Sequence, residues 1–336
     1  MKRVAASSIL VSVMLLAVVV IAQAQQSKKV ARIGYISRDL HPADSRAPAP
    51  RNLQAFREGL RELGYIEDKN IIVEYRYADQ RLERLTALAE DLIRLKVELI
   101  VADTTLTARA ASKVTSTIPI VIVSGSDPIR SGLVASLARP GGNVTGLTNL
   151  IVEMLGKRVE LLKEVVPKVS RFAFLDDDDV RDVNIAELKY AQESAKSLGA
   201  KLERIEVKAS DPDFNGAFRL MSKERIGGLI ASSGPLGATL NRRKILDLVE
   251  KIRIPAIYAS FAWIDDGGLM YYGTHTPDNY RRAATYVDKI LKGAKPGDLP
   301  VEQPKKFELI INLKAAKQIG LTIPPNVLAR ADKVIK

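Results

Sequence analysis

From Arg32 onward, short runs of β-branched and aliphatic residues alternate with longer segments in which an apolar residue recurs every three or four positions. The first run covers 32–36, and the first longer segment carries apolar residues from Leu53 to Leu63 before it ends at Gly64. This alternation is typical of βα units that form a parallel sheet. Further strands are expected at 71–75, 99–102, 120–123 and 144–147, which completes five.

A second series begins after a helix that ends at Pro167. Its strands are expected at 172–175, 202–207, 229–231 and 256–259, with helices near 184–198, 212–223 and 239–252. A strand at 269–272, an amphipathic helix from Tyr280 to Leu291 and a tail follow, too short for a third domain. We therefore predict an α/β protein with two doubly wound parallel-sheet lobes, each with its own core.

The first residues have the pattern of a secretory leader. Lys2 and Arg3 precede an apolar run over 9–22, and Ala22-Gln23-Ala24 forms a small-residue cleavage site. The apolar run is shorter than the ~20 residues that span a membrane. We expect cleavage after Ala24 and a periplasmic product. Because the chain has no cysteine, it cannot be tethered by a lipid on a cysteine.

Size and charge narrow the class of protein. Removing 24 of 336 residues leaves 312, which is more than one hydrophobic core usually covers, so two domains are expected. The formal charge of +12 falls to +10 without Lys2 and Arg3. The remaining Lys and Arg alternate with acidic residues along helices, which is typical of solvated faces rather than of a nucleic-acid surface. We expect no nucleic-acid partner.

The chain lacks the residues of most catalytic sites. His41 and His275 are its only histidines, and no G-x-S-x-G elbow, phosphate loop or H-E-x-x-H pair occurs. We expect neither an enzyme nor a cofactor or metal site, although a hydrolase built on a carboxylate pair stays open.

Ligands of doubly wound sheets bind beyond the carboxyl ends of the strands, so the residues there are the candidate ligand-binding residues. In the first lobe they are Ser37, Tyr75, Tyr77, Thr104, Thr105, Ser124, Ser126 and Asp127. In the second lobe they are Asp176, Asp177, Ser232, Ser233, Tyr258, Ser260 and Phe261. Their hydroxyl groups suit a polar small molecule.

Several candidates have a structural alternative. Asp127 can cap a helix that Pro128 opens and that ends at Gly141, while Ser124 and Ser126 hold a ligand carboxylate. Thr104 and Thr105 can likewise serve as helix caps. Tyr75 and Tyr77 share one side of a strand, where they either stack on a ligand or cover the sheet.

The acidic run from Asp176 to Asp179 has three interpretations: a solvated loop, a site for a cationic ligand group, or a metal site. The run lacks the glycine-punctuated spacing that a calcium loop requires, which disfavours the metal.

Four long blocks resemble one known family. They are AFREGLRELGY at 55–65 with NIIVEYR at 70–76, SGLVASLARPGGNVTG at 131–146, YVDKILKGAKP at 286–296 and LPVEQP at 299–304. Together they resemble the substrate-binding proteins of ABC transporters related to tryptophan and tyrosine uptake. Two places depart from that family: Asp176–Asp179 stands where many relatives have Asn-Pro, and residues 37–51 are idiosyncratic.

The resemblance implies a type I periplasmic-binding fold with three crossovers between the lobes. Lobe one would cover 29–147 and 263–297, lobe two 148–262 and 298–336, with a three-stranded hinge near Thr148, Ser260–Ala262 and Pro300. It further implies a monomer that binds a small polar or aromatic solute, such as an amino acid, and delivers it to an ABC permease and its ATPase. A periplasmic sensor that docks on a receptor ectodomain, and a periplasmic enzyme, stay alternatives.

Overall fold

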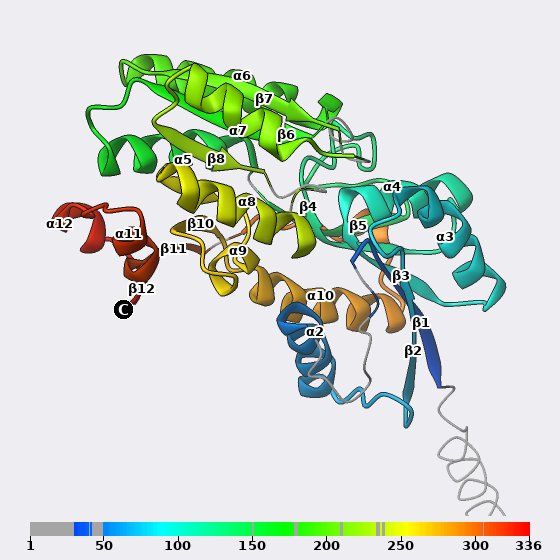
Figure 1. Ribbon diagram of the computed structural model, residues 1–336. Helices are drawn as coiled ribbons and strands as arrows, with labels where there is room; N and C mark the ends of the chain where they lie inside the picture. Colours follow the sequence, from blue (N-terminus) through cyan, green and yellow to red (C-terminus); the bar gives the residue numbers. More distant parts are fainter. Residues whose placement is uncertain are drawn as a thin grey trace, which may run out of the picture.

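The computed structural model describes residues 30–39, 41, 50–149, 151–177, 181–208, 211–232, 236, 239–304 and 306–336. These residues form two α/β lobes, each built around its own sheet (Figure 1). The two-lobed α/β fold class expected from the hydrophobic pattern is confirmed. The expected leader, residues 42–49, Asp178, Asp179 and Ser233 lie outside the described residues.

Lobe one contains a five-stranded parallel sheet with the order β2-β1-β3-β4-β5. The strands are β1 (Ala31–Ser37), β2 (Ile71–Tyr77), β3 (Leu99–Thr104), β4 (Ile120–Gly125) and β5 (Val144–Thr148). The helices around it are α2 (Arg51–Glu62), η1 (Leu82–Arg84), α3 (Leu85–Arg94), α4 (Thr105–Val114), α10 (Thr276–Leu291) and η4 (Pro296–Asp298).

The period of two along each strand divides the core of lobe one into two layers. Val101 and Val121 belong to the layer beneath α2 and α10. Their neighbours Ile100 and Ile120 belong to the layer beneath α3 and α4. Both faces of the sheet are therefore covered by helices, which explains why its strands are almost continuously apolar.

Helices α2 and α10 approach each other closely at Gly59. A Cβ atom at this position would lie 2.5 Å from the backbone oxygen of Arg281 and 3.0 Å from the Cβ atom of Ala284. The glycine thus lets α10, which is far away in the sequence, pack directly on α2. Helix α2 itself ends before Gly64, which has a φ of +86°.

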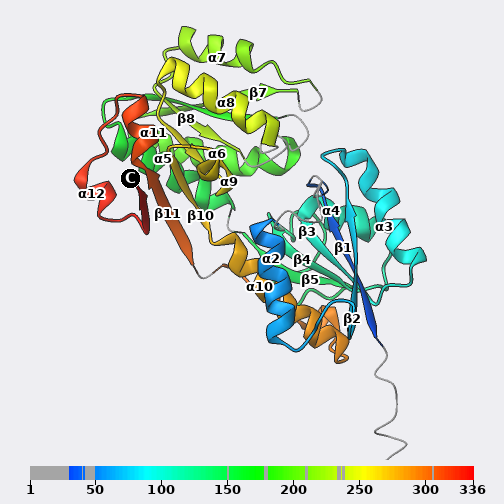
Figure 2. The same ribbon diagram turned by 60° about the horizontal axis from the view of Figure 1, so that its bottom comes forward.

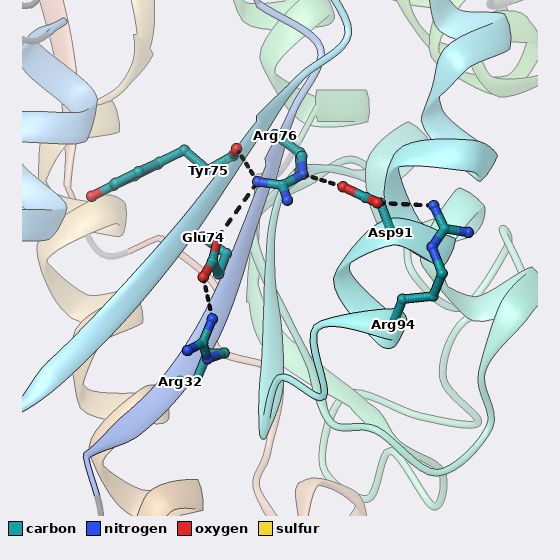
Figure 3. Close-up of polar contacts among 6 residues, drawn as sticks. All are labelled: Arg32, Glu74, Tyr75, Arg76, Asp91 and Arg94. Atoms are coloured by element: carbon teal, nitrogen blue, oxygen red, sulfur yellow. Dashed lines mark hydrogen bonds and ion pairs between the residues drawn. The ribbon is translucent and has the colours of Figure 1, made fainter.

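Charged side chains connect the outer edge of this sheet to α3 (Figure 3). Glu74 of β2 accepts a hydrogen bond from Arg32 of β1 at 2.5 Å and lies 3.7 Å from Arg76. Arg76 donates to Asp91 of α3 at 2.6 Å, and Arg94 donates to the same carboxylate at 2.8 Å. The charged side chains of the edge strand β2 are therefore paired with opposite charges within lobe one.

Lobe two contains a seven-stranded sheet with the order β12-β11-β10-β9-β8-β6-β7. The strands are β6 (Arg171–Asp177), β7 (Lys201–Val207), β8 (Gly228–Ala231), β9 (Ala256–Tyr258), β10 (Met270–Thr274), β11 (Phe307–Asn312) and β12 (Lys333–Ile335). The helices are α5 (Ile151–Val165), α6 (Arg181–Ser197), α7 (Phe214–Lys223), α8 (Thr239–Ile252), α9 (Ala262–Asp265), α11 (Leu313–Gln318) and α12 (Pro325–Leu328). The pair β10 and β11 is antiparallel, so this sheet is mixed rather than fully parallel.

The acidic run of lobe two begins inside the sheet rather than in a solvated loop. Strand β6 continues through Asp176 to Asp177, and neither residue is exposed to solvent. The solvated-loop interpretation is therefore wrong for these two residues, because β7 pairs with β6 along its whole length.

The chain passes between the lobes three times, after β5, between β10 and α10, and between η4 and β11. The second crossover differs from the expected boundary at residue 263. Helix α9 and β10 stay with lobe two, because β10 completes its hydrogen bonding with β9 and β11. The change of lobe occurs between Thr274 and Thr276. The third crossover pairs with the first, since Glu302 exchanges backbone hydrogen bonds with Gly146 and Thr148.

Candidate functional site

The strands of lobe one run with their carboxyl ends toward lobe two (Figure 2). Parallel pairing brings candidates from separate strands together: Ser37 lies opposite Tyr77, and Thr104 lies opposite Ser124. The sequence pattern placed each of these residues at a strand end, and the register makes them neighbours.

The buried carboxylate of Asp103 binds neighbouring hydroxyl groups at these strand ends. Asp103 accepts hydrogen bonds from the Ser37 hydroxyl at 2.6 Å and from the Thr107 hydroxyl at 2.8 Å. Burial and, to a lesser degree, the charge of Asp39 together raise the pKa of Asp103 to about 6, against the opposing effect of the Ser37 hydrogen bond. Ser37, only 2% exposed, thus supports the loop after β1.

The hydroxyl residues after β3 and β4 are already engaged with the backbone or with other side chains. Thr104 caps α4 through a reciprocal pair of hydrogen bonds with Thr107. The Thr105 oxygen accepts the Ser126 backbone N–H at 2.8 Å. The Ser124 oxygen accepts a side-chain N–H of Asn149 at 2.5 Å. Because an accepting hydroxyl keeps its own proton, Thr105 and Ser124 can still donate to a ligand.

Asp127 caps a turn instead of a helix. Its carboxylate accepts the Arg130 backbone N–H at 2.9 Å, but residues 126–143 contain turns and bends only. The expected helix up to Gly141 is therefore wrong. Gly132 adopts a φ of +71°, which lies outside the helical region. Pro140 has no backbone N–H to donate to a helical hydrogen bond. Both residues disfavour a continuous helix in this segment.

Tyr75 and Tyr77 lie on the same side of β2 with their rings nearly parallel, 12° apart, and their centroids separated by 6.3 Å. Tyr75 is held within lobe one, because its hydroxyl donates to Glu67 at 2.7 Å and accepts from Arg57 at 3.0 Å. Tyr77 is closer to the strand end, where the His41 ring contacts it edge-on at 5.2 Å. Of the two tyrosines, Tyr77 is the better placed for a ligand.

In lobe two, a partly buried ion pair lies at the end of β6. Asp176 accepts a hydrogen bond from Arg204 of β7 at 3.0 Å. Asp177 is buried beside it, and Ser232 follows β8 with only 6% of its surface exposed. The Ser232 hydroxyl has no hydrogen-bond partner within the part of the chain that the structure describes. Lobe two thus places acidic and hydroxyl groups at adjacent strand ends.

Tyr258, Ser260 and Phe261 separate into different environments. Tyr258 has no exposed surface, and its ring stacks on Trp263 at 4.6 Å within the core beneath α7 and α8. It does not join the other candidates, because its position in β9 points it into that layer. Ser260 accepts the Ala262 N–H at 3.4 Å. Phe261 is half-buried and lies under the guanidinium of Arg51 from lobe one, 4.8 Å from the ring centroid.

Two residues that the sequence interpretation omitted belong to this region. Asn149, directly after β5, binds Ser124, Thr274 and Asn279 through its side chain. Arg51, the first residue of α2, reaches Phe261. A signal for Asn149 existed, because it follows the expected first crossover at Thr148. Arg51 had no signal, since its partner lies far away in the sequence.

Other kinds of site receive little support. A pocket of about 40 Å³ beside Tyr258, Gly268 and Gln318 lies inside lobe two and has room for only a few water molecules. Within the described ranges, no group of three His, Asp or Glu side chains is placed to bind a metal ion. In the same ranges, no helix has the length and apolar character needed to cross a membrane.

Two α/β lobes joined by three crossovers define the class of type I periplasmic-binding proteins, and solved structures of that class share this fold. The profile of the family described as "ABC transporter substrate binding protein" matches residues 47–335. The chain belongs to this family, as its sequence blocks suggested.

Individual relatives cover most of the chain. A tyrosine-binding protein of Clostridioides difficile is 25% identical over 300 residues, covering 88% of this chain and 82% of the relative. A conserved domain protein from Vibrio cholerae is 29% identical, with a TM-score of 0.81 over 91% of this chain and 100% of that one. A Streptococcus pneumoniae ABC domain in complex with L-Trp is 23% identical, with a TM-score of 0.79, covering 91% of this chain and 99% of the other. The first of these relatives is thus described as a binding protein, and the third was solved with a bound amino acid.

Proposed function

We propose that this protein is the periplasmic binding component of an ABC importer and that it captures an amino acid, with an aromatic amino acid as the first candidate, between its two lobes. The observation that carries the proposal is the arrangement of polar groups at the facing strand ends. Lobe one offers hydroxyl donors at Thr105 and Ser124, and lobe two offers carboxylates at Asp176 and Asp177.

This distribution of charge suits a zwitterion. A hydroxyl that already accepts a hydrogen bond is left to donate, and a ligand carboxylate is the strongest acceptor for it. The negative charge of Asp176 and Asp177 at the strand ends of lobe two favours a nearby ammonium group, because opposite charges attract strongly where water is excluded. Tyr77 and Phe261 add aromatic surface at the same edges.

The relatives support the same class of ligand. One is described as tyrosine-binding and another was solved with L-Trp. The tyrosine-binding relative is 25% identical to this chain, and residues 37–51 of this chain are distinctive. We therefore propose a class of ligand rather than one compound.

We propose closure of the lobes as the mechanism. The moving bodies are 31–148 with 276–298 and 151–274 with 306–335, which turn about the three crossovers. Closure removes water from the ligand and completes its polar contacts from both sides. The energy for transport comes from ATP hydrolysed by the partner subunits, and we expect cleavage after Ala24 to release the protein into the periplasm.

The test is a ligand screen on the protein expressed with its own leader and purified from the periplasm. The sample is unfolded, dialysed and refolded to remove bound solute, and thermal unfolding is then measured with amino acids, aromatic acids, sugars and nucleosides. A ligand present at 100 times its Kd stabilises the native state by about 2.7 kcal/mol, which raises the Tm by several degrees. We expect L-tyrosine or L-tryptophan to give the largest shift.

Three results would contradict the proposal. A sugar or nucleoside that shifts the Tm while no amino acid does so would reject the ligand class. Conversion of the bound compound during long incubation would favour an enzyme. N-terminal sequencing that finds the leader intact would reject export by cleavage.

A further inference from the structure

Asn149 occupies the first crossover and is held from several sides. Its backbone N–H donates to Gly125 at the end of β4 at 2.6 Å. Its side-chain oxygen accepts from the Thr274 hydroxyl at 3.2 Å and from the Asn279 amide at 3.1 Å. Its side-chain nitrogen donates to the Ser124 hydroxyl oxygen at 2.5 Å.

This set of bonds fixes the direction of the Asn149 amide. Thr274 is 6% exposed and Asn279 is 2% exposed, so neither can exchange Asn149 for water. With the NH2 group of Asn279 directed at Asn149, as it is in the structure, a reversed Asn149 amide would set a donor against a donor. The Ser124 oxygen therefore receives an N–H and not a carbonyl oxygen.

The direction matters because a serine hydroxyl carries a single proton. With Asn149 donating into its oxygen, Ser124 retains that proton for another acceptor. We propose that Asn149 is a positioning residue that keeps Ser124 a hydrogen-bond donor toward the carboxylate of the ligand. This inference rests on the proposed function, and it means that a crossover residue decides to which ligand group Ser124 can donate.

The placement also connects ligand recognition to the hinge. Ser124 and Asn279 belong to lobe one, whereas Thr274 is the last residue of β10 in lobe two. The Asn149 amide bonds to all three from the crossover between them. A rotation of the lobes that moved Thr274 would act on the same amide that orients Ser124.

The decisive variant is N149D, which keeps the shape of the side chain. The new carboxylate can still accept from Thr274 and Asn279, but it also accepts the hydrogen bond of the Ser124 hydroxyl. The ligand then meets a hydroxyl with no proton to offer. We expect the affinity for L-tyrosine, measured by calorimetry, to fall about 10- to 100-fold, because hydrogen bonds to charged groups are worth this much.

A mutant cycle separates positioning from general damage. S124A should lose affinity, and the double variant N149D/S124A should lose clearly less than the sum of the two single losses; the loss that N149D still adds to S124A reports the repulsion of the ligand carboxylate by the new charge. The matched control is N143D, since Asn143 donates to Thr115 and Ile118 at the amino end of β5, the opposite end of the strand that Asn149 follows. N143D should lower the Tm and leave the affinity unchanged. Additive losses for N149D and S124A, or an unchanged affinity in N149D, would overturn the inference.

A measurement without ligand distinguishes this inference from the proposed function. In NMR spectra of the ligand-free protein, S124A should shift the side-chain NH2 signals of Asn149, because their acceptor is removed. The control S112A, on α4, should leave them in place. Unmoved Asn149 signals in S124A would reject the positioning role. Failure of the wild type to bind L-tyrosine or any amino acid would reject the proposed function instead.

Discussion

The guanidinium of Arg51 lies over the ring of Phe261, 4.8 Å from its centroid, and this contact joins the first residue of α2 in lobe one to the segment before α9 in lobe two. The charge of Arg51 also acts on Asp265 of α9, where it opposes the rise in pKa that burial causes. A cation from one lobe thus meets an aromatic ring and a carboxylate from the other.

This contact predicts an effect on closure. Arg51→Ala removes a cation–π contact worth about 0.5–1 kcal/mol at an exposed site. We expect bound L-tyrosine to dissociate about two- to fivefold faster, as measured by stopped-flow fluorescence. Small-angle scattering should show a larger radius of gyration for the ligand-free variant. Arg281→Ala is the control, because Arg281 pairs with Glu58 and Glu62 inside lobe one. Equal dissociation rates in wild type and Arg51→Ala would contradict a bridging role.

Asp103 predicts a specific pH dependence of stability. Its pKa is raised to about 6 in the folded protein, against about 3.9 in an unfolded chain. The folded state therefore binds the proton more tightly, and stability falls as the pH rises from about 4 to about 6, by about 3 kcal/mol in total. Asp103→Asn does not titrate.

Urea unfolding of the two proteins between pH 4 and pH 7.5 checks this prediction. The free energy of unfolding of the wild type, minus that of Asp103→Asn, should decrease up to pH 6 and stay constant above it. Titrating groups that do not interact with Asp103 cancel in that difference. Parallel pH profiles would show that the native environment does not favour the protonated carboxyl.

The ion pair between Arg204 and Asp176 predicts an asymmetric mutational response. Asp176 has no exposed surface, so Arg204→Met leaves a buried carboxylate without its cation and should cost about 3–5 kcal/mol in urea unfolding. Replacing both residues, in Arg204→Met with Asp176→Leu, should recover most of this loss. Arg171→Met, which removes two partly exposed ion pairs at the other end of β6, with Glu203 and Glu224, should change stability less. A double variant as unstable as the single one would indicate that Asp176 has a different main partner.

The charged ladder at the edge of lobe one predicts a salt-dependent effect. Glu74→Gln leaves Arg32 and Arg76 facing each other without the intervening carboxylate (Figure 3). We expect a loss of about 0.5–1 kcal/mol at low ionic strength that shrinks at 1 M NaCl, because the groups are partly exposed. Glu160→Gln, which breaks one exposed pair with Lys157, serves as the comparison. A loss that is independent of salt would point to packing rather than charge.

The order of strands and helices followed from the sequence, because alternating and helical periods are local properties. Ile71–Tyr75 was expected as a strand and β2 extends to Tyr77, two residues further. The helix from Tyr280 to Leu291 was likewise visible, since α10 buries the face that the pattern marks. The long blocks of family resemblance then predicted the two-lobed fold.

Local patterns carry no information on what lies across a sheet or between lobes. Four aspartates in a row indicated a solvated loop, but Arg204 on the neighbouring strand and full pairing with β7 place the first two inside. The sequence placed Tyr258 at a strand end and thus among the ligand contacts, but in the structure Trp263 and the core layer under α7 and α8 enclose its side chain. The strand β10 was assigned to lobe one because only hydrogen bonding with β9 and β11 decides its sheet.

The sequence by itself therefore determined the βα order, the family and the strand ends at which ligand-binding residues were sought, since each depends on neighbours along the chain. The tertiary structure alone decided that Asn149 orients Ser124 and that Arg51 reaches Phe261. The physical reason is that a hydrogen bond or a cation–π contact acts over a few ångströms of space. The distance between two residues along the chain does not limit it.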